Sequence, residues 1–235
     1  MLAVVQFPGS NDDRDLHFAL KSVLGAPAAL VWHKDAELPA GTRGVLLPGG
    51  FSFGDYLRCG AMARHSPLMA AVRRFADSGG PVLGICNGFQ VLCEAGLLPG
   101  ALVRNEGLSF ICEAVHVRVE SHDSLFARRT SVGEILTIPI KHGEGRYVAD
   151  ASTLRSMQDN GQIALRYCTT GGEVVATANP NGATANIAGV GNETGNVFGM
   201  MPHPEHAVDL DSGIRSDDGA KILGSLIDSL AGARA

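Results

Sequence analysis

Residues 81–90 join a short apolar run to a helical pattern through a single cysteine. The segment reads Pro-Val-Leu-Gly-Ile-Cys-Asn-Gly-Phe-Gln, and Cys86 lies between glycines at positions 84 and 88. Glycines at these positions let a chain turn sharply from a strand into a helix, so that the side chain at the corner is held exposed. The unpaired N–H groups of a helix N-terminus also favour a thiolate. The pattern predicts a strand–nucleophile–helix turn of the kind found in α/β sheets.

A cysteine beside an apolar strand has a second interpretation. Free cysteine is among the residues that are most often buried, and such a thiol is usually inert. Residues 81–90 alone leave both interpretations open. A catalytic cysteine requires a general base within reach and a group that orients this base.

The first half of the chain alternates predicted strands with predicted helices. Apolar runs predict strands at residues 2–7, 28–32, 44–47 and 82–85. Apolar stripes at helical spacing predict helices at 16–24, 67–76 and 87–95, with Ser66 as an N-cap and Gly96 as a helix stop.

After Gly100 the pattern changes to the alternation of half-exposed strands, first at residues 115–120. Further strands are expected at 135–140, 163–167, 174–177, 187–190 and 197–201, with helices at 151–159 and near 216–230. We therefore expect a doubly wound, mainly parallel α/β sheet, flavodoxin-like, with antiparallel strand additions in the second half. Residues 1–235 are expected to form one domain.

Composition excludes several classes of protein. The net charge of −5 and the absence of a Lys/Arg run give no basis for nucleic acid as a partner. The five cysteines lack metal-ligand spacing, so we expect reduced thiols and no metal site. The N-terminus shows no signal-peptide pattern, and no apolar run is long enough to span a membrane. These features predict a soluble, cytoplasmic protein with no membrane partner.

The best candidate for a base lies in the segment Met-Pro-His-Pro-Glu at residues 201–205. The two prolines stiffen the chain around His203 where it leaves the last predicted strand. Residues two apart in an extended segment point to the same side, so Glu205 could orient the imidazole. The nearest rival is His206, whereas His65, His116 and His122 lack a nearby orienting carboxylate in a fixed segment. A stiff surface loop without function remains the alternative for this segment.

Two glycine-rich loops follow predicted strands. After the third strand, the N–H of Gly50 could form an oxyanion hole together with the N–H of Asn87, although a simple turn would also explain the glycines. Residues 50–58 carry three aromatic side chains, which suit a wall over the site or a contact with a partner. The loop at 141–145, Lys-His-Gly-Glu-Gly, could present backbone groups to a small polar ligand.

Taken together, these segments resemble class I glutamine amidotransferases, and most closely the glutaminase subunits of phosphoribosylformylglycinamidine synthase of purine biosynthesis. The resemblance rests on residues 7–11, 47–58, 84–90, 142–145, 179–182 and 199–205, which keep the family order. It implies that Cys86 is the nucleophile, His203 the general base and acid, and Glu205 the orienter of His203. It also implies an oxyanion hole at Gly50 and Asn87, and glutamine contacts from Gln90, His142 and Gly143.

The chain departs from this family at five positions. Cys is frequent at the position of Asp12, Tyr at Phe53, Ala at Cys59, Ser at Ala183 and Arg at His206. None of these differences removes a catalytic group. Those at Ala183 and His206 bear on local contacts that could face a partner.

The resemblance implies that the chain hydrolyses glutamine to glutamate and ammonia through a cysteine thioester. The sequence contains no Gly-x-x-x-x-Gly-Lys-[Ser/Thr] phosphate loop, so we expect no cofactor in this chain. The implied partners are a large ATP-dependent synthetase subunit, which uses ATP and Mg to convert formylglycinamide ribonucleotide to the amidine, and a small third subunit. We expect weak glutaminase activity from the isolated chain and higher activity in the complex.

Two other classes of protein remain possible from the sequence. A stand-alone cysteine hydrolase or peptidase could use a similar turn, although such enzymes often carry His after the cysteine, where this chain has Asn87. A non-catalytic binding domain could keep the same fold. The combined presence of Cys86, His203 and Glu205 favours an enzyme over that second class.

Overall fold

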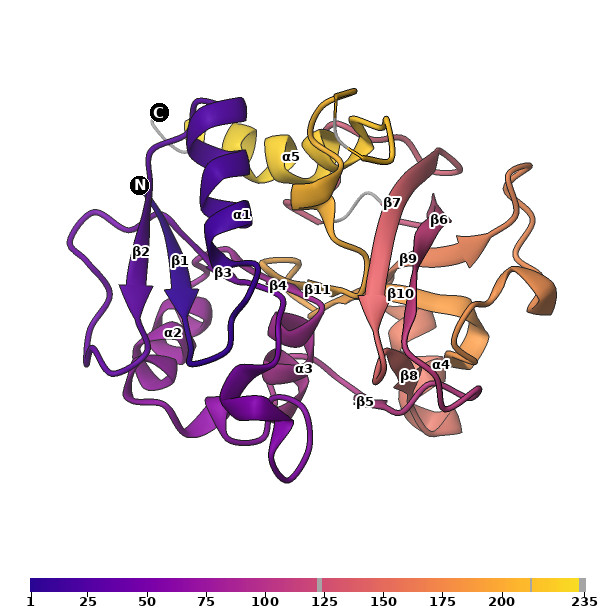
Figure 1. Ribbon diagram of the computed structural model, residues 1–235, viewed down its shortest axis with the longest axis horizontal. Helices are drawn as coiled ribbons and strands as arrows, with labels where there is room; N and C mark the ends of the chain where they lie inside the picture. Colours follow the sequence, from indigo (N-terminus) through magenta and orange to yellow (C-terminus); the bar gives the residue numbers. More distant parts are fainter. Residues whose placement is uncertain (122–123, 212, 233–235) are drawn as a thin grey trace.

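A nine-stranded mixed sheet runs through the computed structural model, which describes residues 1–121, 124–211 and 213–232 (Figure 1). His122 lies outside these residues. The strand order is β2-β1-β3-β4-β11-β10-β9-β6-β7. The strands are β1 Leu2–Gln6, β2 Ala28–Trp32, β3 Gly44–Leu47, β4 Val82–Ile85, β6 Ile111–Val119, β7 Ile135–His142, β9 Ile163–Cys168, β10 Ile187–Gly191 and β11 Val197–Met200.

The sheet has a parallel half and an antiparallel half. Strands β2, β1, β3, β4 and β11 run parallel, and β11 pairs with β4 so that Gly199 lies beside Gly84. Strands β10, β9, β6 and β7 then follow as antiparallel neighbours. The expected doubly wound sheet with antiparallel additions in the second half is confirmed. As a result, the carboxyl ends of β1, β3, β4 and β11 meet at one edge.

Helices cover both faces of this sheet (Figure 1). In the view of Figure 1, α1 and α5 lie above the parallel strands, whereas α2 and α3 lie below them. The α-helices are α1 Asp13–Phe18, α2 Pro67–Asp77, α3 Asn87–Glu94, α4 Ala151–Asp159 and α5 Asp218–Gly232. Helix α1 continues as a π-helix at Ala19–Val23, and short 3-10 turns occur at Ser52–Asp55, Ala63–His65, Ala176–Ala178, Thr184–Asn186 and Pro204–His206. No helix of the described chain is both long and apolar enough to cross a membrane.

Helix α2 shows how the apolar face of a predicted helix is buried in the fold. Pro67 stands at its first position, and the apolar stripe, which includes Leu68 and Val72, is buried against the sheet. Ser66 occupies the N-cap position, but its side chain forms no cap hydrogen bond. Its hydroxyl instead lies 3.0 Å from Nδ1 of the buried His33.

Two features of the fold differ from the sequence expectations. The strand expected at 174–177 is wrong, because this segment leads into the 3-10 turn Ala176–Ala178. Val175 is 42% exposed, and its carbonyl accepts a hydrogen bond from the side chain of Asn186 rather than from a strand. In addition, β5 (Ala101–Val103) and β8 (Arg146–Val148) form a small antiparallel sheet that the sequence did not indicate. Strands of three residues are too short to display an alternating pattern.

Candidate active site

Cys86 forms the corner between β4 and α3, as the sequence predicted. Its backbone has φ 49° and ψ −105°, a conformation that residues with a side chain rarely adopt, and its N–H donates to the carbonyl of Met200 at 2.8 Å. A Cβ at Gly88 would overlap the carbonyl of Leu47, and one at Gly84 would lie 2.6 Å from the carbonyl of Gly88. The two glycines therefore let α3 approach β3 and β4 closely enough to hold the cysteine in this turn.

The N-terminus of α3 offers free backbone donors beside the sulfur. No side chain caps this helix, and within the described chain the N–H groups of Asn87 and Gly50 donate no hydrogen bond. The loop that carries Gly50 is tied to α3, because the N–H of Ser52 donates to Oδ1 of Asn87 at 3.2 Å. Gly50 has φ 132°, and a Cβ there would overlap the backbone of Asn11. The oxyanion hole itself remains a prediction that this geometry supports.

His203 and Glu205 form a buried pair after β11. The N–H of His203 donates to the carbonyl of Pro139 at 2.8 Å, and Nδ1 of the ring lies 2.7 Å from Oε1 of Glu205. The segment is not extended throughout, since Pro204–His206 forms a 3-10 turn. The imidazole has no exposed surface. Because Glu205 engages Nδ1, the second ring nitrogen, Nε2, is left for another partner.

The charge state of His203 follows from its neighbours. Burial lowers the pKa of His203, but the Glu205 carboxylate and the Cys86 sulfur raise it to about 10. Nε2 of His203 has no hydrogen bond of good geometry in the described structure, yet the sulfur is near enough to act on the ring. Cys86 is 5% exposed, and its sulfur also lies 3.8 Å from the carbonyl of Lys141. An imidazolium beside a cysteine stabilises the thiolate, which is the nucleophilic form.

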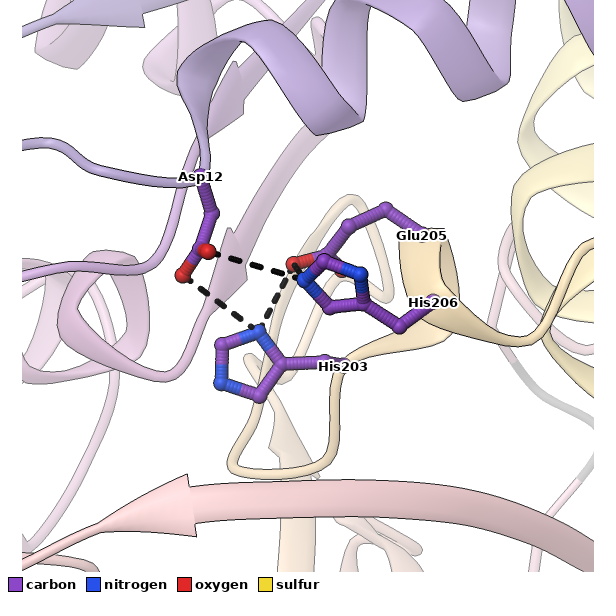
Figure 2. A group of neighbouring side chains, drawn as sticks. All are labelled: Asp12, His203, Glu205 and His206. Carbon is purple, nitrogen blue, oxygen red and sulfur yellow. Dashed lines mark hydrogen bonds and ion pairs between the residues drawn. The ribbon is translucent and has the colours of Figure 1, made fainter. Parts of the chain in front are cut away.

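Asp12, Lys141 and His206 form a second ionic group beside the His203–Glu205 pair, and Figure 2 shows Asp12 and His206 in this group. Oδ2 of Asp12 is 3.6 Å from Nδ1 of His203, and Oδ1 of Asp12 is 2.5 Å from the ammonium of Lys141. Nε2 of His206 lies 3.5 Å from Oδ1 of Asp12 and 3.0 Å from the Lys141 nitrogen. Burial raises the pKa of Asp12, but the His206 hydrogen bond and the charges of His203 and Lys141 bring it well below its usual range.

The sequence did not assign roles to Asp12 and Lys141. In the sequence, Asp12 stands out only as a departure from the family, and Lys141 only as the start of a loop. One signal could have found Asp12, since it follows β1 at the sheet edge where β3 and β4 also end. His206, the rival base, contributes to this second group while His203 holds the buried position.

The side chains of Asp12, His203, Glu205 and His206 could in principle hold a metal ion. Their ligand atoms all lie within 4.8 Å of one another. The ammonium of Lys141, however, already provides a cation next to Asp12 and His206. We therefore assign no metal to this group, and the expected absence of a metal stays a prediction.

The three proposed glutamine contacts lie around the loop at 141–145. Both ends of the Gln90 side chain are hydrogen-bonded within the protein, because its amide donates to the carbonyl of Glu144 at 2.7 Å and its oxygen accepts from Asn87 at 2.8 Å. It thus links α3 to this loop rather than presenting a free side chain. The substrate role of Gln90 remains a prediction.

His142 and Gly143 are held in place by Asn105, which the sequence did not single out. The side-chain amide of Asn105 donates to the carbonyl of His142 at 2.9 Å, and the backbone N–H of Asn105 donates to the carbonyl of Gly143 at 2.9 Å. Burial and the positive charge of His203 lower the pKa of His142 to about 4, so this imidazole is neutral. Its Nε2 is buried and has no partner among the described residues. Asn105 therefore ties the loop together by hydrogen bonds, while its role in glutamine binding stays a prediction.

The aromatic loop at 50–58 divides into inward and outward side chains. Phe53 packs edge-on against His33, with ring centroids 5.3 Å apart. Tyr56 is 74% exposed and Leu57 is 89% exposed, and Phe51 lies 6.5 Å from the exposed ring of Phe110. These outward apolar side chains suit a contact with a partner.

Comparison with known proteins finds relatives along nearly the whole chain. The family described as "CobB/CobQ-like glutamine amidotransferase domain" matches residues 1–219. Phosphoribosylformylglycinamidine synthase subunit PurQ of Rhodopseudomonas palustris (strain HaA2) is 53% identical over 97% of each chain. The same subunit of Moorella thermoacetica is 52% identical over 96% of this chain and 94% of its own. A chain in the structure of PurLQS from Thermotoga maritima has a TM-score of 0.84 at 41% identity, covering 97% of this chain and 98% of that one.

Proposed function

The chain belongs to the CobB/CobQ-like glutamine amidotransferase family, and from this premise we propose that Cys86, His203 and Glu205 are its catalytic residues. It is a glutaminase subunit of phosphoribosylformylglycinamidine synthase, an enzyme of purine biosynthesis. One observation carries the assignment of residues. The buried imidazole of His203 is held by Glu205 at 2.7 Å through Nδ1, while the nearby Cys86 sulfur raises its pKa.

The first half of the reaction forms a thioester. The Cys86 thiolate attacks the side-chain carboxamide carbon of glutamine, and the resulting oxyanion accepts hydrogen bonds from the N–H groups of Gly50 and Asn87. When the tetrahedral intermediate collapses, the carbon–nitrogen bond breaks and His203 gives its Nε2 proton to the leaving ammonia. Loss of one oxyanion donor typically lowers the rate ~10²-fold or more.

The second half returns the enzyme to its starting state. His203, now neutral, takes a proton from water, and the hydroxide attacks the γ-glutamyl thioester. The carbon–sulfur bond breaks, glutamate leaves, and the thiolate–imidazolium pair is restored. Glutamine and water are thereby converted to glutamate and ammonia. Gln90, His142 and Gly143 are proposed to position the glutamine beside Cys86.

We propose that the ammonia is used by a separate ATP-dependent synthetase subunit, assembled with a small third subunit. The relative from Thermotoga maritima comes from a structure of PurLQS, which supports such an assembly. ATP and Mg would be used by the synthetase, with no cofactor in this chain. We also place the protein in the cytoplasm, because all five cysteines are free thiols, as is usual in a reducing compartment.

The assignment predicts that Cys86→Ala abolishes glutamine-dependent activity in the assembled complex. Amidine formation driven by ammonium chloride should continue, because the synthetase then receives ammonia directly. The measurement is amidine formation with each nitrogen source, and the matched control is Cys112→Ala, which removes an exposed thiol on β6. Glutamine-dependent activity that survives Cys86→Ala would show that another residue is the nucleophile.

A further inference from the structure

We propose that Asp12 is a second positioning carboxylate for His203, which acts together with the adjacent Lys141 and His206. The proposal rests on the catalytic role of His203 given above. The hydrogen bond from Nδ1 of His203 to Glu205 is 2.7 Å long, and Oδ2 of Asp12 lies 3.6 Å from the same nitrogen (Figure 2). The ring therefore has one close carboxylate and a second one just outside hydrogen-bond distance.

The backbone fixes Asp12 in this position. Its N–H donates to the carbonyl of Gly49 at 3.3 Å, and its carbonyl accepts from the N–H of Leu16 at 2.9 Å, at the start of α1. A Cβ at Gly49 would lie 2.5 Å from Oδ2 of Asp12 and 2.6 Å from Cε1 of His203. The absence of a side chain at this position therefore lets the carboxylate and the imidazole approach each other. The Asp12 side chain is only 6% exposed, so water screens the interaction weakly.

The charges nearest to His203 come from several elements. Glu205 and His206 lie on the turn after β11, Asp12 precedes α1, Cys86 precedes α3, and Lys141 and His142 are on β7. The carboxylates of Glu205 and Asp12 favour the imidazolium, and the Lys141 ammonium partly offsets the charge of Asp12.

Two consequences follow for the reaction. Asp12 stabilises the imidazolium in the resting enzyme, and its carboxylate can accept the hydrogen bond from Nδ1–H when Glu205 is removed. Among the described residues the Asp12 side chain contacts Lys141, His203 and His206, so we expect it to act through His203. A buried carboxylate that served stability alone would have neither effect.

The first test combines Asp12→Asn with Glu205→Ala in the assembled complex. In the otherwise unchanged enzyme, Asp12→Asn should lower glutamine-dependent kcat about threefold, because Glu205 still holds the ring. In the Glu205→Ala background the same change should lower kcat by a factor about ten times larger, since the effects of substitutions at neighbouring residues are coupled. The control Asp13→Asn removes a carboxylate one position away, whose partner is Gln6, and should have the same small effect in both backgrounds. Equal losses from Asp12→Asn in the two backgrounds would overturn the proposal.

The second test measures the rate at which iodoacetamide alkylates Cys86 in the isolated chain as a function of pH. The upper inflection of this profile reports the deprotonation of His203. Asp12→Asn should move it down by about one pH unit, the usual effect of removing a nearby opposite charge. Lys141→Gln should move it up, because Asp12 then acts on His203 without its cation. An inflection that stays in place in both variants, while circular dichroism shows that they are folded, contradicts the proposal.

The two tests separate failure of this inference from failure of the proposed function. If Cys86 and His203 were not catalytic, Cys86→Ala would leave glutamine-dependent turnover intact. If only the role of Asp12 were wrong, Cys86→Ala would abolish turnover while Asp12→Asn behaved like Asp13→Asn.

Discussion

At the scale of single residues, the site depends on a positively charged imidazole that is buried away from water. Burial alone would leave His203 neutral, as it does His142, whose pKa falls to about 4. The two imidazoles differ in their partners. Nδ1 of His203 meets a carboxylate at 2.7 Å, whereas Nδ1 of His142 meets the neutral amide of Asn105 at 3.1 Å. The partner of each ring thus decides which histidine carries the proton at neutral pH.

The raised pKa of His203 predicts how stability depends on pH. The folded-state pKa of about 10 exceeds the ordinary value of 6.5, so the stabilisation from this charge is fully present below pH 6.5 and is lost as the pH rises toward 10. At pH 6.5 the wild-type protein should therefore have a higher free energy of urea unfolding than His203→Gln. This difference should be smaller at pH 10 by about 1 kcal/mol or more. In the control His65→Gln, which replaces an exposed histidine, the difference from the wild-type protein should be the same at both pH values. A wild-type advantage that is constant across this range would refute the charged state of His203.

The sequence predicted those parts of the site whose interacting residues lie close together along the chain. His203 and Glu205 are two residues apart, and Cys86 is flanked by its own glycines, so each could be interpreted locally. The Lys141–Asp12 contact joins residues that are 129 positions apart. It depends on how β7 and the segment after β1 are placed by the folded sheet, which no local pattern specifies.

At the scale of elements, the fit between α3 and β3 holds Cys86, the proposed nucleophile, in its strained turn. The glycine at 88 is required by the close approach to the carbonyl of Leu47, whereas Gly96 after the same helix is required only by its φ of 66°. These are different physical constraints. One concerns packing between two elements, and the other concerns the backbone of a single residue.

This contrast predicts different costs for two alanine substitutions. Gly88→Ala should lower the free energy of unfolding by about 1–3 kcal/mol, the usual cost of overpacking, and should also reduce iodoacetamide labelling of Cys86 because α3 must shift. Gly96→Ala should cost about 1 kcal/mol from backbone strain and leave the labelling rate unchanged. Urea unfolding and labelling kinetics measure both quantities. Slower labelling in Gly96→Ala, or normal labelling in Gly88→Ala, would contradict the packing argument.

The elements that the sequence predicted well are those with strong local boundaries. Strands β2 and β3 and helix α4 occur at their expected residues, because apolar patterns there end at glycine, proline or capping residues. The capping side chain of Asp150, for example, accepts from the N–H groups of Ser152 and Thr153. The segment at 174–177 also lies between turn residues, at 171–172 and 179–182, but the carbonyl of Val175 accepts hydrogen bonds from Ala178 and Asn186 rather than from a neighbouring strand.

At the scale of the whole molecule, the site lies where the two halves of the sheet meet. The parallel half supplies Cys86 after β4 and His203 after β11, while β7 at the far end of the antiparallel half supplies Lys141. β7 reaches the site because the N–H of His203 donates to the carbonyl of Pro139 on that strand. The proposed catalytic residues therefore come from the parallel half, and the antiparallel half contributes Lys141 and the carbonyl of Pro139 that holds the backbone of His203.

Outward apolar side chains beside this site predict where the synthetase subunit binds. Tyr56 and Leu57 are 74% and 89% exposed, on the loop whose first residues pack against α3 through Ser52 and Asn87. Burying two such side chains in a complex is favourable, because apolar surface leaves water. The double variant Tyr56→Ser/Leu57→Ser should weaken the affinity for the synthetase about tenfold or more, as measured by titration calorimetry. Glutamine-dependent amidine formation at low subunit concentration should fall with it.

The isolated chain provides the control for this last prediction. Because the side chains of Tyr56 and Leu57 are largely exposed, alkylation of Cys86 by iodoacetamide in the free subunit should be unchanged in the double variant. Val175→Ser, which alters an exposed apolar side chain on the loop after β9, should change neither binding nor alkylation. Unaltered affinity in the double variant would place the synthetase on another surface. Slower alkylation would instead mean that the loop shapes the active site itself.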